Sequence, residues 1–209
     1  MKAVKATVDK RRVRGEESRR VILQAAIASI AALGLGNMTL DRVAERAGIS
    51  RALVVFHFKS KSKLIESVLS YLGDRYAQGW REAYELESKN PMQKILHLVD
   101  FDIDFAYDNP NYVSAWHAFW GEAKGNLLYQ NLAFPQDEQY AGEMCNLLAK
   151  VIDQGGYNKD ELEFINMGLG ALLFGIWIES HLSPDERDRA IYKKSVRLFL
   201  AKSFPDTDA

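Results

Sequence analysis

The sequence predicts an all-α protein with two parts, an N-terminal three-helix domain of the helix-turn-helix type and a C-terminal helical domain. Apolar residues recur at helical spacing along most of the 209-residue chain, while alternating strand-like runs are few. Residues 1–63 carry 14 Lys+Arg against five Asp+Glu, a net of +9, and the remainder carries −10. Such asymmetry indicates that one end meets a polyanion, although a solvated basic end without a partner is the alternative.

The first 15 residues predict a flexible basic arm, because they are rich in Lys and Arg and have few apolar anchors. Such an arm either follows the DNA backbone or a minor groove, or it remains idle. A first helix is expected from Glu16 to Leu33, where apolar residues recur on one face, and Gly34 and Gly36 would end it.

Residues 39–58 have the pattern of two short helices joined by one tight turn. Thr39 can cap the first helix, Gly48 can end it in the left-handed conformation, and Ser50 can cap the second helix. This spacing is typical of a helix-turn-helix, whose second helix lies in the major groove of DNA. A helical hairpin of another all-α protein is the alternative.

Three lysines, Lys59, Lys61 and Lys63, follow directly and stand at the start of the next expected helix. Positive charge at a helix N-terminus opposes the helix dipole. A phosphate bound to the free N–H groups there would satisfy the dipole and the lysines together, whereas a solvated charged face is the alternative.

The remaining chain predicts further helices. A long helix from Ser62 to about Ser88 would join the head to the body, and Asn90-Pro91, Asn109-Pro110 and Ser183-Pro184 mark later helix starts. Residues 164–178 form a mostly apolar run that is too short to span a bilayer. The last two apolar helices would either pair with those of a second copy or complete the monomer core.

An aromatic cluster marks the helix after Asn109-Pro110. Tyr112, Trp116, Phe119 and Trp120 fall on one helical face. They form either ordinary core or the wall of a pocket for an apolar or cationic small molecule.

Enzyme chemistry has no support in the sequence. The four histidines have no metal-ligand spacing, the single Cys145 excludes an intramolecular disulfide or a cysteine cluster for zinc, and no nucleotide or nucleophile motif is present. Asp100, Asp102 and Asp104 imitate the start of a calcium loop, but the later positions of that loop do not fit. We therefore expect no catalytic residue, metal or cofactor, and no membrane segment or secretory signal, which fits a cytoplasmic protein.

Residues 16–76 resemble the TetR family of bacterial transcriptional regulators. The resemblance lies in Thr39, Ala44, Gly48-Ile49-Ser50-Arg51, Phe56-His57-Phe58-Lys59-Ser60-Lys61 and Leu64. It implies a homodimer that reads a palindromic operator and is released from it by a small-molecule effector. The chain departs from the family at Val55, where a tyrosine is usual, and at Ala52-Leu53, where Gly-Thr is frequent. Leu53 and Val55 could instead contact thymine methyl groups.

A narrower resemblance points to the choline-responsive repressors of the betaine pathway within that family. It lies in Ala115-Trp116-His117-Ala118-Phe119-Trp120, Leu128-Tyr129 and Gly175-Ile176-Trp177-Ile178. It implies a quaternary ammonium ligand held by Trp116, Trp120, Tyr129, Phe174 or Trp177. Glu122, Asp104 or Glu179 could supply the counter-charge.

The predicted domains are a basic arm at 1–15, a DNA-binding domain at 16–76 and a ligand-binding and dimerisation domain at 77–209. The predicted function is a sequence-specific DNA-binding repressor released by an effector such as choline or another quaternary ammonium or apolar ligand. The expected DNA-contacting residues are Thr39, Ser50, Arg51, Ala52, Leu53, Val55, Phe56, His57, Lys59, Lys61 and Lys63. The alternatives are an effector-independent regulator, or a helical interaction module or enzyme with a fortuitous helix-turn-helix.

Overall fold

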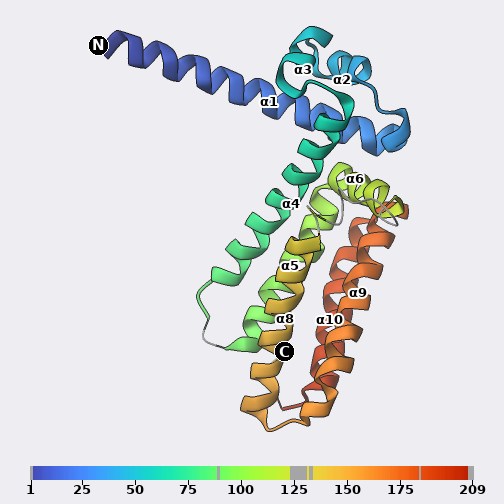
Figure 1. Ribbon diagram of the computed structural model, residues 1–209. Helices are drawn as coiled ribbons and strands as arrows, with labels where there is room; N and C mark the ends of the chain where they lie inside the picture. Colours follow the sequence, from blue (N-terminus) through green and yellow to red (C-terminus); the bar gives the residue numbers. More distant parts are fainter. Residues whose placement is uncertain (1, 89, 123–130, 132–133, 184, 207–209) are drawn as a thin grey trace.

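The computed structural model describes residues 2–88, 90–122, 131, 134–183 and 185–206, and within them it contains helices and no strand. A head formed by the first three helices stands on a body formed by the later helices, and one long helix runs between them (Figure 1). The helices are α1 (Lys2–Asn37), α2 (Leu40–Ala47), α3 (Arg51–Phe58), α4 (Lys61–Glu85), α5 (Pro91–Asp108), α6 (Pro110–Gly121), α8 (Phe134–Gly155), η1 (Lys159–Glu161), α9 (Leu162–Leu182) and α10 (Glu186–Ser203). The predicted fold class is confirmed.

The head contains the expected helix-turn-helix. Thr39 accepts a hydrogen bond from the backbone N–H of Arg42 at 3.3 Å, and Ser50 accepts one from Leu53 at the same distance. Gly48 between them adopts φ 65° and ψ 31°, the left-handed conformation that glycine reaches without strain. Local chemistry therefore sets both helix boundaries.

The first helix differs from its prediction at both ends. It begins at Lys2, so residues 2–15 are helical where the sequence predicted a flexible arm. This segment has no proline, its first glycine is Gly15, and its Ala, Lys and Arg residues favour helix. At the other end the helix continues to Asn37, but Gly34 has φ 76° and ψ 165°, which kinks it where an end was expected.

The long helix α4 connects the two halves of the molecule. Ser60 caps it by accepting a hydrogen bond from Lys63 N–H at 3.2 Å. Its 25 residues span about 38 Å. Leu64 packs in the apolar core of the head and Trp80 in that of the body, so one helix belongs to both.

The short helix α6 lies between head and bundle and contacts α1 (Figure 1). Its buried residues Val113, Trp116 and Phe119 belong to the same apolar cluster as the core of the head. Head and body therefore share packed side chains.

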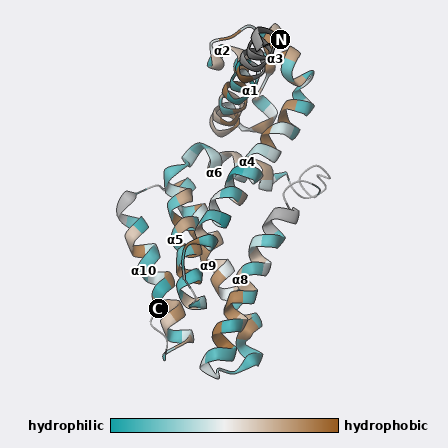
Figure 2. Ribbon diagram, turned by 90° about the vertical axis from the view of Figure 1, so that its left-hand side faces the viewer, coloured by the Kyte–Doolittle hydropathy of each residue, from teal (hydrophilic) through white to brown (hydrophobic). Residues whose placement is uncertain are grey.

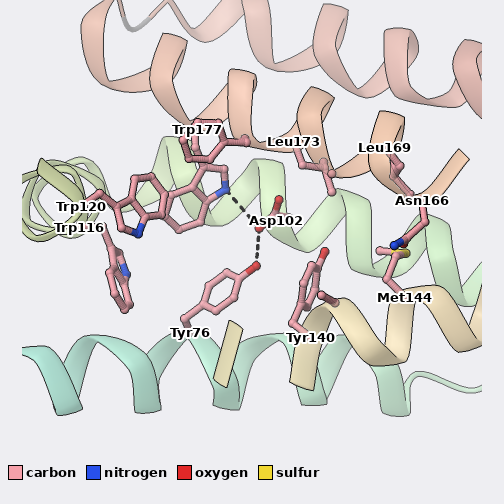
Figure 3. A pocket seen from close by; sticks show the side chains of 13 residues that line it. Tyr76, Asp102, Trp116, Trp120, Tyr140, Met144, Asn166, Leu169, Leu173 and Trp177 are labelled. Carbon is pink, nitrogen blue, oxygen red and sulfur yellow. Dashed lines mark hydrogen bonds between the residues drawn. The ribbon is translucent and has the colours of Figure 1, made fainter. Parts of the chain in front are cut away.

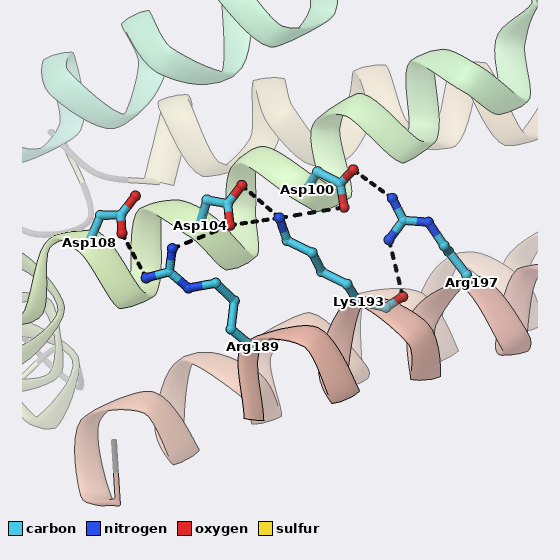
Figure 4. A network of polar contacts seen from close by, with 6 residues as sticks. All are labelled: Asp100, Asp104, Asp108, Arg189, Lys193 and Arg197. Carbon is cyan, nitrogen blue, oxygen red and sulfur yellow. Dashed lines mark hydrogen bonds and ion pairs between the residues drawn. The ribbon is translucent and has the colours of Figure 1, made fainter. Parts of the chain in front are cut away.

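The helices of the body form an upright bundle in which α10 is held against α5 by a ladder of ion pairs (Figure 4). Asp100 pairs with Arg197 at 2.6 Å, Asp104 with Lys193 at 2.6 Å, and Asp108 with Arg189 at 2.7 Å. Three acids spaced by four residues share one helical face. This pairing explains why two of the acids that imitate a calcium loop are not available to a metal.

Figure 2 shows apolar stretches on helices of both the head and the body, as expected for helices that each bury one side. Two segments, Val13–Asn37 and Lys159–Leu182, are long and apolar enough to cross a membrane by length and composition. The first buries its apolar face in the head. The second leaves Phe164 73% and Met167 66% exposed, which marks α9 as a surface with unusual apolar exposure.

Two Leu→Ala changes, one at Leu64 in the first turn of α4 and one at Leu86 directly after the helix, test this packing. Leu64 is fully buried, so Leu64→Ala should lower the free energy of unfolding by about 2–5 kcal/mol. Leu86 is 52% exposed, and Leu86→Ala should change the free energy of unfolding by no more than about 0.5 kcal/mol. Urea unfolding at one protein concentration measures both, and equal losses would contradict the described packing.

Candidate functional site

The surface of α3 carries most of the residues expected to contact DNA. Val54 and Phe58 are buried against the head, while Arg51, Ala52 and Phe56 face solvent. Leu53, Val55 and His57 are half-buried beside them. Phe56 is 67% exposed, which is unusual for a ring that large and leaves it available for contact with another molecule.

Arg51 at the start of α3 forms an ion pair with Asp41 of α2 at 3.1 Å. Both side chains are largely exposed, and surface pairs of this kind contribute at most about 1 kcal/mol. Arg51 can therefore exchange Asp41 for a base edge or a phosphate at little cost.

The three lysines beside the recognition helix contact groups of the protein itself. The Nζ atom of Lys59 donates to the carbonyl of Phe56 at 2.9 Å, that of Lys61 to the carbonyl of Gly36 at 2.8 Å, and that of Lys63 pairs with Glu66 at 2.6 Å. All of these hydrogen bonds are exposed, so a phosphate could replace any of the acceptors.

His57 at the end of α3 is kept neutral. Burial lowers the pKa of His57, and the nearby charges of Arg19 and Lys59 lower it further. At neutral pH its imidazole would therefore meet a phosphate as a neutral hydrogen-bond donor.

A cavity of about 490 Å³ lies in the body between helices α4, α5, α6, α8 and α9 (Figure 3). Its volume is within the range of about 300–1,000 Å³ that is usual for small-molecule sites. Its lining consists of Tyr76, Asp102, Trp116, Trp120, Tyr140, Ala141, Met144, Asn166, Leu169, Gly170, Leu173, Phe174 and Trp177.

Four of the five predicted ligand-binding residues meet at one end of this cavity. The ring centroids of Trp120 and Trp177 are 6.0 Å apart, those of Trp120 and Phe174 are 5.2 Å apart, and Trp116 stacks on Trp120 at 6.3 Å. The fifth predicted residue, Tyr129, lies outside the described residues. The sequence did not indicate Tyr76, whose ring stands edge-on to Trp177 at 5.5 Å.

Asp102 is the acidic residue among the described lining residues of the cavity. Asp102 is only 3% exposed, and it accepts hydrogen bonds from the Tyr76 hydroxyl at 2.6 Å and from the Trp177 indole N–H at 3.1 Å. Burial raises the pKa of Asp102 to about 6, and these two hydrogen bonds oppose the rise by stabilising the carboxylate. The cavity therefore offers a negative charge that a cation would neutralise.

The counter-charge candidates from the sequence do not line this cavity. Asp104 pairs with Lys193 on the other side of α5, and Glu122 and Glu179 are exposed. Asp102 lies two positions before Asp104 and therefore on a different face of the helix. The available signal was its place on the apolar stripe of α5, one helical turn from buried Leu98 and Val99.

Tyr140 of α8 adds a polar group to the same cavity. Burial raises the pKa of Tyr140, with a further rise from the Asp102 charge and an opposing effect of the Tyr76 hydroxyl. Its hydroxyl therefore remains protonated and can donate a hydrogen bond.

The chemistry of the cavity is that of binding. Aromatic faces attract a cation that lies within about 6 Å of the ring centroid, and a buried carboxylate adds direct charge attraction. Within the described residues no group of three or more His, Cys, Asp or Glu is placed to hold a metal ion.

Comparison with known proteins gives two family matches. Residues 22–68 match the family of bacterial regulatory proteins called the tetR family, and residues 91–205 match the C-terminal domain of the BetI-type transcriptional repressors. The HTH-type transcriptional regulator BetI 1 of Chromohalobacter salexigens is 29% identical over 81% of this chain and 82% of its own length. The regulator BetI of Proteus mirabilis is 24% identical over 83% of this chain and 84% of its own length.

Solved structures share the fold. A transcriptional regulator from Pseudomonas aeruginosa has a TM-score of 0.77 at 19% identity, covering 91% of this chain and 92% of its own. A transcriptional regulator from Saccharomonospora viridis, solved in complex with choline, also has a TM-score of 0.77 at 19% identity. The match covers 88% of this chain and 96% of that one.

The raised pKa of Asp102 predicts a stability that depends on pH. Between about pH 4 and 6 the folded protein holds a proton on Asp102 that the unfolded chain releases, so stability is lost as the pH rises through about 6. Two pKa units correspond to roughly 3 kcal/mol. Urea unfolding at roughly pH 4.5 and pH 7.5, on the two sides of this transition, should show the loss of stability in the wild type and not in Asp102→Asn. Parallel pH profiles of the two proteins would contradict the raised pKa of Asp102.

Proposed function

Because this chain belongs to the TetR family of bacterial regulatory proteins, with a C-terminal domain of the BetI type, we propose that it is a homodimeric repressor released from its operator by a quaternary ammonium cation. Members of this family are transcriptional regulators and not enzymes, which confirms the predicted DNA-binding regulator. The effector, the dimer, the operator contacts and action in the cytoplasm are the parts that we propose.

The recognition helix would read DNA with few hydrogen bonds. Arg51 is the exposed side chain of α3 that can bond a base edge in two places, whereas Leu53, Val55 and Phe56 offer apolar contact to thymine methyl groups. Lys61 and Lys63 at the start of α4 would hold phosphates on the flank. Specificity would then depend on Arg51, on methyl groups and on DNA shape.

Two copies of the chain would pair through the last two long helices. Phe164 and Met167 of α9 and Ile191 and Leu198 of α10 are large apolar residues that are each more than half exposed. Such a surface is costly to leave in water and is self-complementary in a symmetric dimer. Two heads related by a two-fold axis would read a palindromic operator.

The buried carboxylate of Asp102 among aromatic rings is the observation that supports a cationic effector. A charge removed from water is unfavourable unless it is paired, and the described lining residues include no Lys, Arg or His. A quaternary ammonium cannot donate a hydrogen bond, so aromatic faces and one carboxylate suit it. The choline complex of the structural neighbour and the BetI names of the relatives support the same class.

Two of the helices that line the cavity also contact the head, so a bound cation could change the position of the head. Trp116 and Trp120 belong to α6, which contacts α1 of the head, and Tyr76 belongs to α4, which enters the head core. A cation that draws these rings together would shift both helices. Release follows only if the shifted arrangement binds the cation more tightly and the operator less tightly.

Two substitutions separate base reading from phosphate contact. Arg51→Ala should weaken operator binding by about 1–3 kcal/mol and relax sequence preference, because a base contact is lost. Lys63→Ala should weaken binding to all sequences and reduce the slope of log K against log salt by about 1. Fluorescence anisotropy with operator and scrambled DNA at several salt concentrations measures both. The absence of salt-dependent binding would contradict the proposed interface.

Choline and its neutral analogue, in which a tert-butyl group replaces trimethylammonium, test the charge requirement. The two have the same shape, so preference for choline reports attraction by Asp102 and the rings. Titration followed by tryptophan fluorescence should give tighter binding of choline, and Trp120→Ala should remove most of that preference. Choline should also release the protein from its operator, and equal binding of the two compounds would refute a cation site.

The same titration should depend on pH in a defined direction. A bound cation favours the ionised form of Asp102, whose pKa of about 6 means that it is largely protonated below that value. Choline affinity should therefore fall as the pH drops below about 6, by up to tenfold per pH unit, while affinity for the neutral analogue should stay constant. Asp102→Asn should abolish the pH dependence.

A further inference from the structure

The cavity is longer than a compact cation requires. Along α9 its lining runs from Trp177 back to Asn166, which are eleven residues apart and therefore about 16 Å apart along the helix axis. A cation held by the aromatic end lies within about 6 Å of the ring centroids. Roughly 10 Å of lined space along α9 then remains beyond the cation. Figure 3 shows the two ends of this lining, with Trp116 and Trp120 at one end and Asn166 and Met144 at the other.

The chemistry of the lining changes along this length. Past Asp102 and Tyr140 the walls are formed by Met144, Leu169 and Leu173, which are buried apolar side chains, and the amide of Asn166 stands at the far end. The described lining residues include no cationic side chain that could pair with a negative group there. This half of the cavity therefore favours an uncharged hydrocarbon chain and disfavours a carboxylate.

Gly170 lines the apolar half of the cavity and is itself exposed. A Cβ added to it would meet no atom within 4 Å, so a larger side chain has room at this position. Because Gly170 shares a helical face with Leu173 and Trp177, such a side chain would narrow this half of the cavity. Gly142 of α8 has equally open surroundings but does not line the cavity, so it offers a matched control.

From this geometry we infer that the preferred ligand is a quaternary ammonium that carries an uncharged alkyl or acyl chain. The ammonium lies against Trp120 and Trp177 beside Asp102, and the chain extends along α9 past Leu173 and Gly170 toward Asn166. This inference rests on the proposed function, since it specifies the ligand class of the same site. It distinguishes the site from one for choline alone and from one for a zwitterion with a terminal carboxylate.

A series of choline esters tests the inference on the full-length protein. Dissociation constants are measured by isothermal titration calorimetry for choline, acetylcholine, butyrylcholine and hexanoylcholine. Affinity should rise by up to about fourfold for each methylene added, because each one leaves water for the apolar half. Succinylcholine monoester, whose chain ends in a carboxylate, should bind more weakly than butyrylcholine.

Two glycine substitutions show where the chain lies. Gly170→Leu should remove most of the gain of hexanoylcholine over choline, whereas Gly142→Leu should leave the whole series unchanged. Both changes replace glycine within a helix by a good helix former, so both variants should fold, and thermal unfolding followed by circular dichroism verifies this independently of ligand binding.

The outcomes are distinguishable from those of the proposed function. Choline binding with no gain along the series would overturn the inference and leave the proposed function intact. A gain that persists in Gly170→Leu would also overturn it, because the chain would then lie elsewhere. Absence of binding for every cation, choline included, would refute the proposed function together with this inference.

Discussion

The body of this protein is organised around one buried carboxylate. Asp102 of α5 is held by the Tyr76 hydroxyl of α4 and the indole N–H of Trp177 of α9, so three helices converge on a single charged group. A buried carboxylate is costly unless its oxygens are paired, and these two donors stabilise it only in part, as the raised pKa of Asp102 shows. The remaining need for positive charge is what makes the cavity beside it suited to a cation.

Helix α5 carries acidic side chains on two faces, and these acids have different partners. On one face of α5 the acids Asp100, Asp104 and Asp108 meet cations of α10 and hold that helix in place. On another face Asp102 has hydrogen-bond donors but no cation among the described lining residues. Asp102 therefore differs from the paired acids of α5, because it has no cationic partner among the described lining residues, and this difference supports the proposed cation site.

The parts of the prediction that depended on local chemistry were accurate. Thr39, Gly48 and Ser50 act on backbone groups within a few residues, so the helix-turn-helix could be recognised from the sequence and the structure places its caps as expected. Four of the aromatic residues predicted on α6 and α9 do line one cavity, because large rings at helical spacing can be recognised in the sequence, and their role in ligand binding stays a prediction. Asp102 was not among the counter-charge candidates, although it lies one helical turn from buried Leu98 and Val99, whereas Asp104 lies on another face of α5.

The sequence by itself determined the helical class, the caps and turn of the recognition unit, the basic head and the aromatic residue types that line the cavity. These follow from interactions between residues close in the chain or from composition. Only the tertiary structure decided that Trp120, Trp177 and Tyr76 face one carboxylate, that α10 neutralises the other acids of α5, and that the cavity continues along α9. Each of these depends on how helices far apart in sequence are rotated and packed against one another, and periodicity within a single helix does not specify that rotation.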